Sequence, residues 1–222
     1  MMDQKEAAHA VLVEVVNILG VFKNDFVVVG GWVPDLKYPG RNHVGSLDVD
    51  LAVGPGAVGA DAYSTILGRL KEHHYSHESG PTRFYRTVPG ASEPVKVDLV
   101  SGEYADNGKT AAIQVDELRL SALHGIDIAF EAHEEITIEG QMPDGTHNVV
   151  RARIVRPEAF ILLKAFALAE RAKEKDAYDI AFILHHYEPT LAQLAGHLAP
   201  LIADGLGREA YQILTEKFAT LK

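Results

Sequence analysis

The 222-residue sequence contains no cysteine. Disulfide bonds and thiolate metal sites are therefore excluded, and a reducing compartment suits the protein. The first twenty residues lack the basic segment of a secretory signal, and no apolar run approaches the length that spans a membrane. We therefore expect a cytoplasmic protein without membrane association.

Positive charge is also scarce, because 21 Lys and Arg residues face 31 Asp and Glu residues, giving a net charge of −10. This balance does not indicate a general nucleic-acid-binding protein, although a local basic patch would still suffice for one. The densest basic candidates are Arg83 with Arg86, and the group Arg151, Arg153 and Arg156. The remaining composition, 47% hydrophobic and 23% charged, is that of an ordinary globular protein.

The most informative stretch begins with an apolar run, residues 26–29, which ends in Gly30 and Gly31. Glycines at the end of a strand let the backbone approach a phosphate closely. Residues 32–37 have helical character, and the N–H groups at a helix N-terminus add phosphate donors. The pattern favours a phosphate-binding turn.

A second strand is predicted over residues 47–52, where apolar and polar side chains alternate. Asp48 and Asp50 therefore lie on the same face of that strand. Two neighbouring carboxylates repel each other, and a divalent cation such as Mg²⁺ relieves the cost of ionising both. With the Gly-Gly turn, the two aspartates predict a site for a metal-bound nucleoside triphosphate.

These residues resemble the signature of the DNA polymerase β-like nucleotidyltransferase superfamily, and most closely that of the AbiEii-type nucleotidyltransferase toxins of bacterial toxin–antitoxin systems. The resemblance rests on Gly30-Gly31 and on the run Ser46-Leu47-Asp48-Val49-Asp50-Leu51. One departure is visible, since Gly31 and Asp48 are seventeen positions apart, more than the commonest spacing in the superfamily. Residues 39–45, PGRNHVG, are therefore interpreted as an extended loop.

Two more strands are predicted over residues 82–87 and 94–100. Asp98 lies in the second, where an aspartate needs a reason because strands are depleted in this residue. One interpretation is a solvated charge on an edge strand, paired with Lys96. The resemblance instead implies that Asp98 is the third carboxylate of the superfamily, which binds a second metal ion and acts as base toward the attacking hydroxyl.

Residues 135–139 and 148–155 alternate on either side of a Pro-Asp-Gly turn and predict a β-hairpin. Strands that follow the metal strands favour an α+β fold, with a mixed nucleotidyltransferase-like sheet flanked by helices. Residues 116–130 are interpreted as a connecting helical piece. We expect two domains, an α/β core over residues 1–156 and a helical region over residues 157–222 that closes the cleft.

Pro157 begins a long predicted helix at its favoured first position. Lys164 lies in the apolar face of that helix, where snorkelling to water and binding of a triphosphate explain it equally well. Asp176 and Asp179 follow on one helix face, and their simplest interpretation is a helix cap and a solvated charge. With Arg171 and Lys175, however, the arrangement is similar to the C-terminal motif of AbiEii-like proteins, which implies that Lys164 and Asp176 belong to the active site.

His73 and His77 are interpreted as lying one helical turn apart, a spacing that suits zinc. No acidic partner in a metalloprotease pattern follows them. Solvent-exposed histidines at the end of a helix are the other interpretation.

The resemblance implies transfer of a nucleoside monophosphate from an NTP to an acceptor, chemistry that depends mainly on positioning and charge stabilisation. Asp48, Asp50 and Asp98 would bind Mg²⁺ in a two-metal site, and Lys164 would neutralise the departing pyrophosphate. The nucleotide-binding candidates are Gly30, Gly31, Ser46, Lys164 and Asp176.

The acceptor that the resemblance implies is a tRNA 3′ end or a protein hydroxyl, with an antitoxin protein as a partner. Two alternatives stay open. One is an aminoglycoside-like nucleotidyltransferase, whose cationic substrate would suit the net charge of −10. The other is a catalytically silent relative that binds a nucleotide or a partner protein.

Overall fold

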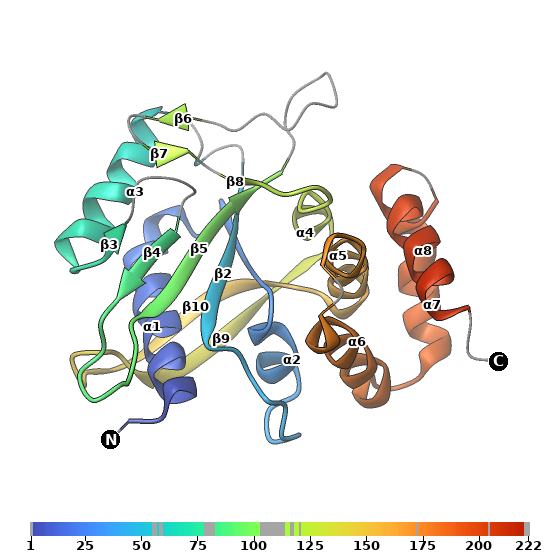
Figure 1. Cartoon of the computed structure of the whole chain (residues 1–222), viewed down its shortest axis with the longest axis horizontal. Helices are drawn as coiled ribbons and strands as arrows, with labels where there is room; N and C mark the ends of the chain where they lie inside the picture. The colour runs from blue at the N-terminus through green and yellow to red at the C-terminus, as the bar shows by residue number, and fades with distance from the viewer. Residues whose placement is uncertain are drawn as a thin grey trace.

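The computed structural model describes residues 2–54, 57, 60–77, 83–102, 114–115, 118–119, 121–171, 173–203 and 205–219. Within them a mixed β-sheet runs through the centre of the molecule (Figure 1). Its strand order is β3-β4-β5-β2-β1-β10-β9, with β8 paired to β5 beside this path. These strands are β1 (Phe26–Val29), β2 (Asp48–Val53), β3 (Ser76–His77), β4 (Arg83–Arg86), β5 (Val95–Ser101), β8 (Ser121–Ala122), β9 (His133–Gln141) and β10 (His147–Val155). A separate ladder joins β6 (Gln114–Val115) to β7 (Leu118–Arg119).

The sheet contains both parallel and antiparallel pairs. β2 is antiparallel to β1 and parallel to β5, whereas β1 is parallel to β10. β4 is antiparallel to β5, and β9 forms an antiparallel hairpin with β10. The predicted hairpin and the predicted α+β class are both confirmed, and the strand β4 falls within the predicted residues 82–87, of which residue 82 lies outside the described ones.

Some helices cover the sheet, and others gather on one side of it. They are α1 (Gln4–Ile18), the short 3₁₀ helix η1 (Gly20–Phe22), α2 (Trp32–Lys37), α3 (Ala60–Glu72), α4 (Ile128–Glu131), α5 (Pro157–Glu170), α6 (Glu174–His186), α7 (Leu191–Leu201) and α8 (Gly205–Phe218). α1 packs against β2, β5, β9 and β10, while α5 contacts α4, α6, α7, α8 and α2. Figure 1 shows α5 to α8 gathered on one side of the sheet. Among the described residues no helix combines the length and apolarity that crossing a membrane requires.

The core side of α1 also buries a charge. Glu14 is 5% exposed and accepts hydrogen bonds from the Tyr75 hydroxyl at 2.8 Å and from Arg86 Nε and Nη2 at 2.8 and 3.0 Å. A buried carboxylate needs such partners, because it is costly to desolvate alone. Arg86, one of the basic candidates from the sequence, therefore forms a structural ion pair with Glu14.

Two local predictions are wrong. In the predicted helical piece over residues 116–130, residues 118–119 belong to β7 and residues 121–122 to β8, and the helix that follows spans Ile128–Glu131. Residues 116, 117 and 120 lie outside the described ones. The reason lies at Gly125, whose φ of +84° and close approach to Phe166 break any helix there. Likewise α3 ends at Glu72, so that His77 lies in β3 and does not share a helical turn with His73.

Candidate functional site

The Gly-Gly turn passes directly over one of the predicted metal ligands. Gly30 follows β1 with a φ of +70°, in the left-handed region that favours glycine. A Cβ atom at Gly30 would lie 2.0 Å from Asp50 Oδ2. No larger residue fits, so the turn places the Gly30 backbone against the Asp50 carboxylate.

The side chains of two other residues approach Gly31 closely. A Cβ atom there would lie 2.9 Å from the Ser46 Oγ and 2.9 Å from the Lys175 Nζ. Ser46 comes from the loop before β2, and Lys175 comes from the first turn of α6. A hydroxyl and an ammonium group from distant parts of the chain therefore meet at the glycine turn. The sequence pointed to Ser46, whereas Lys175 entered only as part of a motif.

The predicted carboxylates stand on adjacent strands in matching register. β2 and β5 pair in parallel, with Asp50 opposite Asp98 and Asp48 opposite Lys96. The pKa of Asp50 is raised to about 6, first by burial and then by the negative charges of Asp98 and Asp48. Lys164 acts in the opposite direction. The three aspartates are thus close enough to influence one another.

Basic side chains hold the two outer carboxylates. Arg83 binds Asp98 in a bidentate pair, with Nε 2.7 Å from Oδ1 and Nη2 3.0 Å from Oδ2. Lys96 Nζ lies 3.0 Å from Asp48 Oδ2. Asp98 is on β5, an interior strand between β4 and β2, so the edge-strand interpretation is wrong. Its cation is Arg83 and not Lys96.

As these side chains stand, no cluster of three or more His, Asp or Glu residues in the described chain is arranged to hold a metal ion. Arg83 and Lys96 pair with three of the four carboxylate oxygens of Asp98 and Asp48, and a cation would compete with these pairs. The donor set itself, carboxylate oxygens on neighbouring strands, is of the kind that Mg²⁺ prefers. The predicted Mg²⁺ site therefore fits in its chemistry and stays a prediction.

Lys164 is buried between two carboxylates. Its Nζ lies 2.7 Å from Asp176 Oδ1 and 2.7 Å from Asp179 Oδ2, and 5.5 Å from the centre of the Phe160 ring. With 7% of the residue exposed, the snorkelling interpretation is wrong. Lys164 joins α5 to α6 and keeps a positive charge near Asp50.

Asp176 and Asp179 are both buried, in contrast to the cap and the solvated charge considered from the sequence. The N-cap of α6 is Lys173, and Asp176 also accepts a hydrogen bond from Arg171 Nε at 3.2 Å. Burial alone would raise the pKa of Asp179. A hydrogen bond from His43 and the charge of Lys164 outweigh burial and lower that pKa to about 2.

His43 is a site residue that the sequence did not reveal. It lies in the loop before β2, its side chain is fully buried, and its Nε2 is 3.0 Å from Asp179 Oδ1. A single histidine in a polar loop belongs to no periodic pattern, and its partner is 136 positions away. No local feature of the sequence could have identified it.

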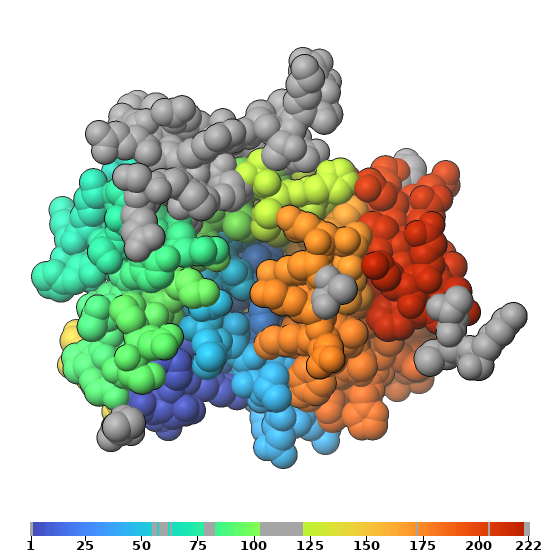
Figure 2. All heavy atoms as spheres, in the orientation of Figure 1, coloured from blue at the N-terminus to red at the C-terminus, as the bar shows by residue number. Residues whose placement is uncertain are grey.

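The molecular surface is hollowed where these elements meet. In Figure 2 the hollow lies between the green segment that carries β4 and β5 and the orange segment that carries α5 and α6. Blue atoms from the early part of the chain form its floor. This placement agrees with a site built from β2, β5 and α6.

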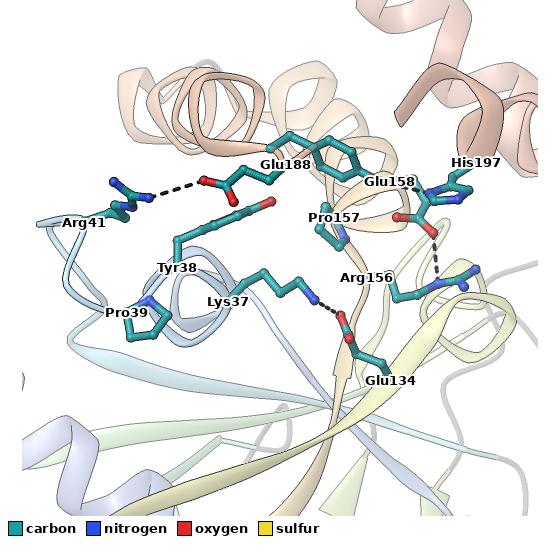
Figure 3. Close-up of a pocket in the computed structure, with 11 residues that line it drawn as sticks. Lys37, Tyr38, Pro39, Arg41, Glu134, Arg156, Pro157, Glu158, Glu188 and His197 are labelled. Atoms are coloured by element: carbon teal, nitrogen blue, oxygen red, sulfur yellow. Dashed lines mark hydrogen bonds and ion pairs between the residues drawn. The ribbon is translucent and has the colours of Figure 1, made fainter. Parts of the chain in front are cut away.

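A separate pocket of about 520 Å³ lies near the start of α5 (Figure 3). Its charged side chains form three ion pairs, which are Lys37 with Glu134, Arg41 with Glu188, and Arg156 with Glu158. None of the predicted site residues lines it. Since its cations are already paired with its own carboxylates, the pocket offers no evident phosphate site.

The mixed sheet with its C-terminal helices is a nucleotidyltransferase-like fold. A crystal structure of an antigenic nucleotidyltransferase-like protein from Paracoccidioides brasiliensis is similar in fold, with a TM-score of 0.55 and 17% sequence identity over 97% of this chain and 90% of that one. More specifically, the chain belongs to the AbiEii nucleotidyltransferase toxin family of type IV toxin–antitoxin systems, whose family model matches residues 15–217.

Two further comparisons add little. The solution structure of the antibiotic-resistance factor ANT(2'')-Ia matches over 97% of this chain and 96% of that one, with 13% identity and a TM-score of 0.43. A comparison with curated proteins gives no match.

Proposed function

We propose that the protein transfers a nucleoside monophosphate from an NTP to a hydroxyl group of an acceptor and releases pyrophosphate. The observation that carries the proposal is the contact of the Gly30 backbone with the Asp50 carboxylate, with Asp98 opposite Asp50 on the next strand. Membership of a nucleotidyltransferase family supports the same chemistry.

The triphosphate would lie on the turn of Gly30 and Gly31. Ser46 and Lys175 face this turn and would bind phosphate oxygens by a hydroxyl hydrogen bond and by charge. Lys175 is 43% exposed in its side chain, so a ligand can reach it. Lys164 is buried and already paired with Asp176 and Asp179, so its share in neutralising the pyrophosphate would come through its charge and through the residues that it holds in place.

Asp48, Asp50 and Asp98 would hold Mg²⁺. Bound there, Mg²⁺ would neutralise phosphate charge and favour ionisation of the attacking hydroxyl. Asp98 would accept the proton of that hydroxyl. The acceptor oxygen then forms a bond to the α-phosphorus while the bond from that phosphorus to the pyrophosphate oxygen breaks, so that the electron pair leaves with pyrophosphate.

The family supports a role as the toxin of a toxin–antitoxin pair, with an antitoxin as partner. A tRNA 3′ end and a protein hydroxyl are the first acceptors to test. The basic candidates give RNA little support, because Arg86 and Arg156 pair with Glu14 and Glu158. A cationic small molecule is the alternative that the net charge of −10 favours.

The test is incubation with each α-labelled NTP, Mg²⁺ and one acceptor class at a time: total tRNA, cellular protein, or aminoglycosides. Asp50→Asn is the inactive variant, and Asp144→Asn, in the exposed hairpin turn, is its matched control. Label that reaches one acceptor class with the wild type and the control, but not with Asp50→Asn, establishes the activity and the acceptor. NTP binding without transfer to any acceptor class would overturn the proposed transferase activity and favour a catalytically silent relative that binds nucleotides.

A further inference from the structure

We propose that His43 is a positioning residue that locks the loop of residues 38–47 onto α6, and so fixes Ser46 and Asp48 relative to the glycine turn. The consequence for nucleotide binding rests on the proposed function. The lock itself rests only on the structure.

The two ring nitrogens of His43 have opposite roles. The Gly45 N–H donates a hydrogen bond to Nδ1 at 3.0 Å, so that Nδ1 carries no proton in this arrangement. Nε2 is then the protonated nitrogen, and it donates to Asp179 Oδ1 at 3.0 Å. The side chains of His43 and Asp179 are both fully buried. One ring therefore ties the loop to itself and to α6.

Several contacts hold this loop, which bends through left-handed positions with φ angles of 76° at Gly40, 58° at Asn42 and 74° at Gly45. Asn42 is the residue with a side chain among these three, and asparagine tolerates this region better than most residues. Lys5 from α1 binds the His43 carbonyl oxygen at 3.1 Å and holds the loop from the other side. The His43 ring also packs against Tyr178 and Phe182 of α6, at centroid distances of 5.3 and 4.7 Å.

Asp179 connects this lock to the cations of the site. Its oxygens also bind Lys164 at 2.7 Å and Lys175 at 3.1 and 3.2 Å. The loop, the buried cation of α5 and the exposed cation at the glycine turn thus share one carboxylate. The long spacing between Gly31 and Asp48 then has a structural purpose, since the additional residues reach α6.

Two substitutions separate the roles of the ring. Glutamine places an amide N–H near the position of Nε2, so His43→Gln can keep the bond to Asp179. Asparagine places an oxygen near the position of Nδ1, so His43→Asn can keep the bond from Gly45 but is too short for Asp179. His185→Asn, at an exposed position of α6, is the matched control.

The first measurement is hydrogen exchange of the full-length protein without nucleotide, followed by mass spectrometry. We expect exchange in residues 38–47 to rise by about tenfold or more in His43→Asn and to stay near the wild-type rate in His43→Gln and His185→Asn. Equal behaviour of the two His43 variants would overturn the lock, as would faster exchange spread over α1 and β10, because either result would mean general packing.

The second measurement is NTP affinity by equilibrium binding. We expect His43→Asn to weaken binding by about tenfold and His43→Gln to restore most of it. Faster exchange with unchanged affinity would keep the lock and overturn its link to the nucleotide site. If the wild type does not bind NTP at all, the proposed function fails while the exchange result still decides the lock.

Discussion

Asp50 lies where burial and two neighbouring carboxylates all oppose its ionisation, and its pKa is raised to about 6. In the unfolded chain this pKa returns to about 3.9. Between these values the folded protein binds more protons than the unfolded chain, so stability of the metal-free protein falls as pH rises through this window. Asp179 does not interfere, because its lowered pKa of about 2 adds stability that is lost only below about pH 4.

The substitution Asp50→Asn removes this penalty. We expect the free energy of unfolding of the metal-free protein at about pH 8 to rise by up to about 3 kcal/mol, and its fall between about pH 4 and 6 to flatten. Urea unfolding in the presence of a chelator measures both effects. A variant that is no more stable than Asp144→Asn at high pH would contradict the account of Asp50.

Arg83 forms a bidentate ion pair with Asp98, the carboxylate that is proposed as the third metal ligand. A cation must displace this pair before it can bind Asp98, so Arg83→Gln should raise the affinity for Mn²⁺, used as a probe for Mg²⁺, by about threefold to tenfold. Electron paramagnetic resonance of free Mn²⁺ measures the affinity. Arg151→Gln, which breaks an exposed pair with Glu135, is the control. Unchanged Mn²⁺ affinity in Arg83→Gln would rule out competition at Asp98.

Gly31 tests the glycine turn with a single methyl group. In Gly31→Ala the new Cβ meets the flexible end of Lys175 at 2.9 Å and the Ser46 Oγ and Cβ at 2.9 and 3.1 Å, so Lys175 can swing away while Ser46 must shift by a few tenths of an ångström, and the fold should survive. We expect NTP binding to weaken by about tenfold, because the methyl group fills the phosphate site. Gly20→Ala, where a Cβ would meet nothing within 4 Å, is the control. Equal affinities in the two variants would show that the triphosphate binds elsewhere.

Periodic patterns in the sequence predicted those helices and strands that local sequence determines. The strand before Gly30, the short helix after Gly31 and the β9–β10 hairpin were predicted because alternation and turn residues are local features. β8 was missed because two residues become a strand only by pairing with β5. The role of Asp98 could be inferred only from a family resemblance, since no local pattern places β5 beside β2.

The α5–α6 pair depends on one buried cation. Lys164→Met would leave Asp176 and Asp179 with less compensation in a buried position, and we expect a loss of about 3–5 kcal/mol in the free energy of unfolding. Chemical denaturation followed by circular dichroism measures it, with Lys217→Met on the exposed face of α8 as the control. A loss no larger than that of the control would mean that the network does not join the two helices.

Over the whole molecule, the candidate site draws on residues from position 30 to position 179, which lie in the glycine turn, in the loop before β2, on β2 and β5, and on α5 and α6. The sequence could give the identities of the aspartates and glycines, because their motifs are short and ordered. It could not give the convergence of Lys175 with Ser46, or the contact of His43 with Asp179, because both depend on packing of α6 against a distant loop. Single residues outside motifs are therefore the part of the site that only the structure supplies.

The proposed function depends on cleavage of an NTP at its α-phosphorus. The most direct measurement uses the same NTP labelled in parallel on the α- and γ-phosphates, with Mg²⁺, the identified acceptor, and Asp50→Asn beside Asp144→Asn. We expect α-label to appear on the acceptor, γ-label to appear in pyrophosphate in equal amount, and Asp50→Asn, but not Asp144→Asn, to abolish both. Transfer of γ-label to the acceptor, or full activity in Asp50→Asn, would contradict the proposed function.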